Sequence, residues 1–211
     1  MTTTPDHPVD GTGLGATTAG GDHRPRVAVV IGSTRTNRIC PGIARWASHV
    51  LAHGSLLHYD LVDLAEVDLP FLDEPRMPAL GHYQHEHTRS WSRLVASFDA
   101  FVFVFPQYNW GYPAPLKNAL DFLYAEWRDK PAGLVTYGTR GGARAAEQMT
   151  MVLRGLHMRA LDENVELIIT DADVDDHGDL LDLETTLSPF AGAVRGMDVA
   201  LTSRLEDDQG H

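Results

Sequence analysis

The sequence predicts a three-layer doubly wound α/β fold built on a five-stranded parallel sheet. Five short β-rich segments alternate with five segments of helical periodicity, which is the pattern of repeated strand–helix–strand units. The first and third β-rich segments are continuously apolar, as expected for strands that helices bury on both faces. The 211 residues suffice for one such domain without a stabilising disulfide or metal. We expect the strand order 2-1-3-4-5, one of two common solutions for this pattern.

The strands are expected at residues 27–31, 57–64, 101–105, 133–137 and 165–169. The first reads VAVVI and ends at Gly32, where a polar loop begins. The second alternates apolar and polar residues more regularly, which favours a position near an edge of the sheet. The third reads FVFVF, is the most apolar of the set, and is therefore expected to be central.

Helices are expected between these strands. The first begins near Pro41, because the missing N–H of proline is tolerated in the first helical turn. The others are expected at residues 84–97, at residues 115–127, after the glycine-containing turn at 138–142, and at residues 183–205, where apolar residues recur at helical spacing. A proline-containing loop is expected at 67–83. The acidic stretch 171–182 is expected to be a solvated loop, because its carboxylates lack the order of a calcium-binding loop.

The composition argues against several classes of function. The chain has 29 acidic and 17 basic residues, a net charge of −12, which disfavours binding to nucleic acid phosphates. No apolar run approaches the roughly 20 residues that a membrane-spanning helix needs. The single cysteine, Cys40, excludes an internal disulfide and fits a reducing compartment. We therefore expect a cytoplasmic protein that binds neither nucleic acid nor membrane.

The two ends are expected to lie outside the folded domain, which we place at residues 25–205. Residues 1–24 contain almost nothing to bury, so a disordered tail is expected, and they lack the basic start and apolar centre of a signal peptide. The glycine-rich segment 11–16 follows no strand, so it is not expected to bind a dinucleotide. Residues 206–211 are polar, and we expect a frayed C-terminal tail.

Two loops that follow buried strands contain the most unusual residues of the chain. Residues 32–38, GSTRTNR, follow the first strand and precede a helix, where free amides and the helix dipole favour an anion. Arg35 and Arg38 add guanidinium groups that match a phosphate. A polar turn with solvated arginines is the alternative. In the expected strand order, this loop meets the loop after the third strand at the point where the order reverses, and ligands bind at that point.

The second of these loops, residues 106–113, reads PQYNWGYP. Its amides can donate and accept hydrogen bonds at the edge of a heteroaromatic ring, and its aromatic side chains can stack on a flat ligand. A further loop after the fourth strand, YGTRGG at residues 137–142, allows close backbone approach at its glycines. Packed aromatics and a plain tight turn are the alternatives for these two loops. All three loops are expected at the same edge of the sheet, and this convergence favours a ligand site there.

With PLKNALD at residues 115–121, these loops resemble the NADPH-dependent FMN reductase family, and the resemblance covers about residues 26–205. It implies a flavodoxin-like fold, FMN as cofactor, NADPH or NADH as electron donor, a small-molecule electron acceptor and a homodimer or homotetramer. The FMN-binding residues that it implies, grouped as phosphate loop, ring loop and far side of the ring, are Ser33, Arg35 and Arg38; Pro106, Gln107, Tyr108, Asn109 and Trp110; Gly138, Thr139, Arg140 and Gly141.

The implied function is an FMN-dependent NAD(P)H oxidoreductase that passes electrons to a flavin, quinone, azo compound or similar acceptor. No catalytic side chain is expected, because the hydride chemistry belongs to the flavin. One alternative is a non-enzymatic flavodoxin-like electron carrier or flavin-binding partner. Another is a reductase that supplies free reduced FMN to a monooxygenase.

Several other residues are expected to be structural, and no metal is expected. His85 and His87 are two positions apart and would diverge on a helix, so we assign them, with His82, to a solvated loop and helix start. Cys40 is expected to pack in the core. Lys117 is expected at a helix surface or an interface. We expect a partner subunit to cover exposed aromatic side chains, namely those of Trp110, Tyr112 and Trp127.

Overall fold

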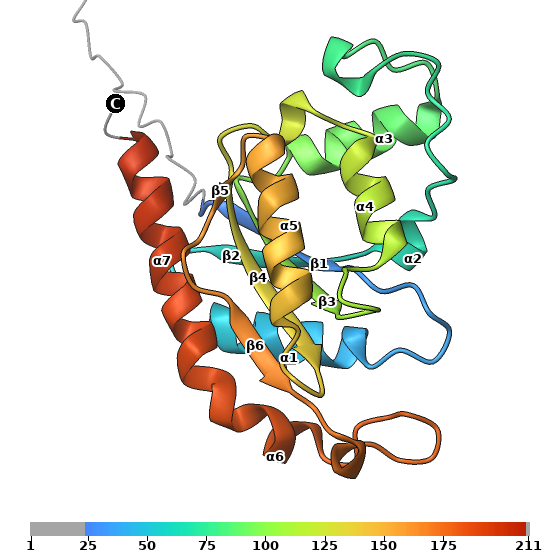
Figure 1. The fold of residues 1–211 in the computed structure, drawn as a ribbon. Helices are drawn as coiled ribbons and strands as arrows, with labels where there is room; N and C mark the ends of the chain where they lie inside the picture. Colours follow the sequence, from blue (N-terminus) through green and yellow to red (C-terminus); the bar gives the residue numbers. More distant parts are fainter. Residues whose placement is uncertain (1–23, 210–211) are drawn as a thin grey trace, which may run out of the picture.

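The computed structural model describes residues 24–209, and Figure 1 shows its fold. The disordered tail expected at residues 1–24 lies outside the described residues except for Arg24, and so do residues 210–211 of the expected C-terminal tail. The remaining predictions about strands, helices and loops fall within the described part of the chain.

Within the described residues, a parallel sheet with the order β2-β1-β3-β4-β5 forms the centre of the fold, and β6 also pairs with β4. This confirms the predicted order, with β2 at an edge and the fully buried β3 in the middle. The strands are β1 Arg26–Ile31, β2 His58–Asp63, β3 Ala100–Pro106, β4 Pro131–Gly138, β5 Arg159–Ala160 and β6 Val165–Ile168.

Helices cover both faces of the sheet, as Figure 1 shows. On one face, α1 (Cys40–Ala52), α6 (Leu183–Leu187) and α7 (Ala191–Gln209) pack against side chains that include Val27 and Val29. On the other face, α3 (Glu86–Ala96), α4 (Ala114–Asp121) and α5 (Ala143–Gly155) pack against side chains that include Ala28 and Val30. The alternating residues of β1 therefore enter two different cores, which explains its unbroken apolar sequence.

Short helical segments connect these elements. The four-residue helix α2 (Leu64–Val67) follows β2 directly, and the side chain of Asp63 accepts a hydrogen bond from the Ala65 amide at its start. The four 3₁₀ turns among the described residues are η1 Pro78–Leu80, η2 Ala125–Trp127, η3 Asp171–Asp173 and η4 Ser188–Phe190.

The sheet has six strands where the sequence predicted five. Two short strands share the β4 edge: Arg159 and Ala160 of β5 pair with the start of β4, and β6 pairs with its end. Residues 161–164 interrupt the pairing between them. A two-residue strand has no recognisable β pattern in a sequence, because alternation needs at least four residues to be visible.

Two helices differ from what their apolar spacing predicted. The third predicted helix stops at Asp121 rather than near Trp127; the chain then turns, and the buried Trp127 indole donates to the Leu120 carbonyl at 3.1 Å. The helix predicted at 183–205 is interrupted by η4, where Pro189 lacks the N–H that a continuous helix needs. Its second part, α7, runs to Gln209, so the domain boundary expected at residue 205 falls inside this helix.

Candidate functional site

The three loops singled out in the sequence leave the same edge of the sheet. Strand β1 pairs with β3, and β3 pairs with β4, all in parallel, so their carboxyl ends lie side by side (Figure 1). The arrangement brings together residues 32–39, 107–113 and 139–142. We refer to them as the edge loops.

The first edge loop turns tightly against the central strand. The Gly32 amide donates to the Val104 carbonyl at 2.8 Å, and a Cβ on Gly32 would lie only 3.0 Å from Leu116 Cδ2 and 3.1 Å from Phe105 Cβ. Beyond this point, the backbone amides of residues 34–37 donate no hydrogen bond to any described residue. Helix α1 then begins without a side-chain cap. Unpaired amides in a loop that leads into a helix, together with the helix dipole, favour an anion.

The two arginines of this loop differ. Arg35 is exposed and has no carboxylate partner among the described residues, so its charge is available to a ligand. Arg38 donates through Nη2 to Asp63 of β2 at 2.5 Å, and both side chains are largely buried. The Nε atom of Arg38 is buried and has no partner in the described structure. An anion in the loop would give this donor the acceptor that the protein does not supply.

The second edge loop is a tight two-residue turn. Tyr108 and Gly111 exchange two backbone hydrogen bonds of 2.8 and 2.9 Å, and Asn109 and Trp110 between them have φ values of 49° and 70°. Positive φ at both central positions is the pattern of a type I′ turn. The Trp110 side chain is 66% exposed, so the turn holds an indole in solvent beside the edge loops.

Hydrogen bonds join the second loop to its neighbours. The Ser33 hydroxyl, fully buried, lies 3.0 Å from the Tyr108 hydroxyl, which connects the first two loops. The Gln107 side-chain oxygen accepts from the Ala145 amide at 3.3 Å and thereby caps the start of α5. Gln107 thus has a structural contact in addition to the expected contact with the flavin ring. Its NH₂ group remains able to donate a hydrogen bond to a ligand.

The third edge loop is fixed by its glycines. Gly141 and Gly142 have φ values of 75° and 90°, and a Cβ on either would lie 2.9 Å from a neighbouring side chain. The Thr136 hydroxyl donates to the Gly141 carbonyl at 2.7 Å and holds the turn against the sheet. Thr139 and Arg140 at the tip are exposed, and Arg140 has no carboxylate partner in the described structure.

Cys40 and Tyr137 are both buried beneath the edge loops. The buried Cys40 thiol donates to the Val104 carbonyl at 3.2 Å, which is the packing role expected from the sequence, and burial raises its pKa to about 11. Burial also raises the pKa of the Tyr137 hydroxyl, so both groups stay protonated near neutral pH.

The sequence patterns assign no site role to three residues near the edge loops. Asp63 pairs with Arg38, although the two residues are far apart in the chain. Only the predicted pairing of β1 with β2 could have indicated that they lie close together. The guanidinium carbon of Arg144 lies 5.3 Å from the centre of the Trp110 ring, and no local sequence pattern predicts this contact. Asn118 bonds both the Pro70 carbonyl and the Leu72 amide, which anchors the loop after α2.

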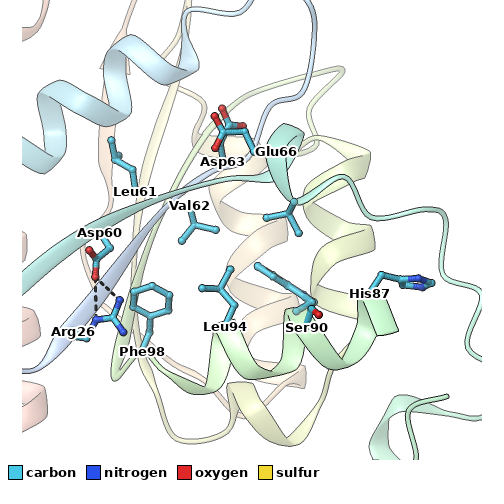
Figure 2. A pocket seen from close by; sticks show the side chains of 12 residues that line it. Arg26, Asp60, Leu61, Val62, Asp63, Glu66, His87, Ser90, Leu94 and Phe98 are labelled. Carbon is cyan, nitrogen blue, oxygen red and sulfur yellow. Dashed lines mark hydrogen bonds and ion pairs between the residues drawn. The ribbon is translucent and has the colours of Figure 1, made fainter. Parts of the chain in front are cut away.

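A cavity of about 520 Å³ lies away from the edge loops, between β2 and α3 (Figure 2). Its floor is apolar and includes Val62, Leu94 and Phe98. Its arginine, Arg26, donates to Asp60 at 3.1 and 2.9 Å and stacks on Phe98 at 4.7 Å. The charge of Arg26 is therefore neutralised within the protein.

Other polar side chains have local structural partners. His87 contacts Asp73 at 2.9 Å and stacks on His85, and Lys117 bonds Asp121 one helical turn later. Among the described residues, no group of three or more His, Cys, Asp or Glu side chains is arranged to hold a metal ion. The helices that the structure describes include none that is long and apolar enough to cross a membrane.

Comparison with known proteins identifies relatives of this chain. Residues 25–171 match the family described as NADPH-dependent FMN reductase. An NAD(P)H-dependent FMN reductase of Schizosaccharomyces pombe is 46% identical over 137 residues, covering 64% of this chain and 68% of the relative. The NAD(P)H-dependent FMN reductase LOT6 of Saccharomyces cerevisiae is 42% identical over 147 residues, covering 64% and 77%.

A solved structure confirms the fold. The flavoenzyme NAD(P)H:(acceptor) oxidoreductase FerB of Paracoccus denitrificans aligns with a TM-score of 0.65 over 87% of this chain and 98% of its own. Its sequence is 21% identical, so this likeness concerns the flavodoxin-like fold alone. The family match extends from β1 through all three edge loops to η3, and on this evidence the chain belongs to the NADPH-dependent FMN reductase family.

Proposed function

We propose that this chain is an FMN-dependent NAD(P)H oxidoreductase that passes electrons to a small acceptor such as a flavin, quinone or azo compound. When bound, FMN supplies the hydride and electron-transfer chemistry. The observation that carries the proposal is the first edge loop. There, the unpaired amides of residues 34–37 and the free charge of Arg35 lie just before α1 in a chain of net charge −12.

The described residues fit a flavin phosphate. Ser33, Arg35 and the unpaired Nε of Arg38 would hold the phosphate, with the amides of residues 34–37 as further donors. A phosphate oxygen accepts charge-assisted hydrogen bonds from amides and guanidinium groups, and it would satisfy the donors that the protein leaves unpaired. Arg38 also has a second role, because its bond to Asp63 fixes the end of the loop against β2.

The second and third edge loops would hold the ring system. Pro106, Gln107, Tyr108 and Asn109 would lie along one side, and the turn from Gly138 through Thr139 and Arg140 to Gly141 along the other. Hydrogen bonds within the protein fix the backbone of both turns, so little ordering is required on binding. No side chain is needed as an acid or base.

We also propose that the chain forms a homodimer or homotetramer. The loop between α2 and α3 exposes several apolar side chains, with Phe71 88%, Met77 69% and Leu80 53% exposed. Asn118 anchors the start of this loop near the edge loops. Partner burial would remove this apolar surface from water. Trp127 no longer supports the proposal, because this chain buries it completely.

Light scattering tests the oligomer. The expected mass is a multiple of the 23.2 kDa chain, and a monomer at micromolar concentration would contradict the proposal. A cytoplasmic location is also part of the proposal, and the free thiol of Cys40 supports it, because such a thiol persists most readily in a reducing compartment.

The visible absorption spectrum of the FMN-loaded protein tests the activity. We expect NADPH or NADH to bleach the flavin under anaerobic conditions, and a quinone or azo acceptor to restore its colour over repeated cycles. A bound flavin that stays oxidised in excess NADPH and NADH would instead indicate an electron carrier. Loss of FMN on gel filtration with activity restored by added FMN would indicate release of flavin to a partner enzyme.

A further inference from the structure

Trp110 occupies an unfavourable position. Its side chain is 66% exposed, and its backbone has a φ of 70°, a region that glycine adopts far more easily than a bulky residue. Glycine is the preferred residue at the second central position of a type I′ turn. Tryptophan here leaves most of its side chain in water and does not relieve the strain of a positive φ. Folding therefore does not explain its presence. Strain held in an exposed turn beside a ligand site indicates a functional contact.

The contact of Trp110 with Arg144 defines the surface that this side chain presents. The Arg144 guanidinium, from the start of α5, lies 5.3 Å from the centre of the indole ring. Its ion pair with Glu147 is long, 3.6 Å, and both side chains are mostly exposed. Arg140 of the third edge loop is also exposed and has no carboxylate partner among the described residues. An aromatic ring and two cations therefore lie at the outer rim of the edge loops.

This combination matches a planar group that carries a nearby anion. An exposed indole stacks on a purine, and a guanidinium forms charge-assisted bonds with a phosphate monoester. The proposed FMN phosphate is assigned to the first edge loop, and the proposed FMN ring contacts include Arg140 but not Arg144. FMN therefore does not account for the Arg144 guanidinium. A neutral quinone would use the indole but not the guanidinium groups. The adenosine 2′-phosphate half of NADPH would use both.

We propose that Trp110 and Arg144 form a subsite for the adenosine 2′-phosphate portion of NADPH, with the adenine on the indole and the phosphate on the guanidinium. The inference rests on the proposed function, because it assigns residues to the electron donor of that reaction. It makes Trp110, which the family resemblance groups with the FMN-binding residues, and Arg144 specificity-determining residues for the electron donor. It also assigns a preference for NADPH over NADH to this chain.

The test compares full-length variants with three electron donors: NADPH, NADH and reduced nicotinamide mononucleotide, which lacks the adenosine portion. Trp110→Gly should raise the KM for NADPH about tenfold, from lost stacking, and leave the KM for reduced nicotinamide mononucleotide unchanged. Trp110→Phe should retain most of the wild-type KM. The melting temperature of Trp110→Gly should equal or exceed that of the wild type, because glycine suits the turn.

Arg144→Gln should raise the KM for NADPH more than the KM for NADH, which has no 2′-phosphate. The matched control is Arg154→Gln, which removes an exposed arginine from the last turn of the same helix and should change neither value. A further control, Val199→Ala, removes exposed apolar surface from α7 and should likewise have no effect.

Five results would overturn the subsite. In Trp110→Gly, three of them are an unchanged KM for NADPH, an equal rise in the KM for reduced nicotinamide mononucleotide, and a weaker FMN affinity or raised acceptor KM in place of the NADPH effect. The fourth is a wild type that uses NADPH and NADH with the same KM. A changed oligomer mass in Trp110→Gly would assign the residue to a subunit interface and would also overturn it. Failure of the wild type to reduce FMN with any donor would instead contradict the proposed function.

Discussion

The edge loops and the β2–α3 cavity both contain arginine side chains, but only the edge loops leave their charge available. In the cavity, Arg26 has a carboxylate on one side and the Phe98 ring on the other. At the edge loops, Arg35 and Arg140 have no carboxylate partner among the described residues. The β2–α3 cavity pairs its arginine within the protein. The first edge loop instead combines unpaired donors with two smaller hollows, one of about 320 Å³ beside Thr34 and one of about 330 Å³ beside Arg38 and Ile39. The proposed site therefore rests on these unpaired donors rather than on cavity volume.

The largest expected effect compares two aspartates of β2. Asp63, whose side chain is 12% exposed, pairs with Arg38 behind the edge loops, whereas Asp60, 31% exposed, pairs with Arg26 in the cavity. Asp63→Ala should lower the free energy of unfolding by about 3 kcal/mol, because it leaves a nearly buried cation unpaired and removes the cap of α2. Asp60→Ala should cost about 1 kcal/mol or less. Urea denaturation measures both, and equal losses would contradict the comparison.

The next effect concerns alkaline pH and the thiol beneath the edge loops. Burial raises the pKa of Cys40 from 9.0 to about 11, so the folded state holds this proton more tightly than the unfolded state. The stability that the protonated Cys40 thiol contributes to the folded state is fully present below pH 9. It is lost as the pH rises toward 11. Between pH 9 and 10, the wild type should therefore lose about 1 kcal/mol more stability than Cys40→Ala.

Denaturation curves at the two pH values measure this difference. In each protein, the stability at the higher pH is compared with the stability of the same protein at the lower pH. The cavity that Cys40→Ala creates lowers stability equally at both pH values and therefore cancels. Parallel losses in the two proteins would show that the thiol ionises in the folded state as it does in the unfolded state.

The smallest effect is expected from the segment before β1. Removing residues 2–23 should change the free energy of unfolding by less than about 0.5 kcal/mol and leave FMN affinity unchanged, because these residues offer little apolar surface to bury. Paired urea and FMN titrations of the shortened and full-length chains measure both quantities. A clear drop in either would show that the segment contacts the folded domain.

The sequence was sufficient to predict the sheet order and the meeting of the edge loops. The apolar runs VAVVI and FVFVF identified the buried strands, and parallel topology then placed their following loops together. The sequence was not sufficient for contacts between distant residues. Nothing near Arg38 marks Asp63 as its partner, and nothing near Trp110 predicts a positive φ or the approach of Arg144. Such contacts depend on how packed elements meet in space, which local periodicity does not encode.

Local sequence pattern also did not predict where some helices and strands begin and end. Leu123 and Trp127 continue the apolar spacing of α4, yet the chain leaves the helix at Asp121 and still buries both side chains. Tertiary packing overrode helical periodicity there. The same holds for β5, where two residues form a strand only because β4 provides an unpaired edge.

The central claim is that Arg35 provides the available charge for a flavin phosphate, and one set of titrations tests it directly. FMN and riboflavin are titrated into the wild type, Arg35→Ala and the control Arg26→Ala. We expect Arg35→Ala to weaken FMN binding roughly ten- to a hundredfold, the value of a charge-assisted hydrogen bond, and to leave riboflavin binding nearly unchanged. Arg26→Ala should bind FMN as the wild type does. Wild-type FMN affinity in Arg35→Ala, or an equal loss of riboflavin affinity, would contradict the account.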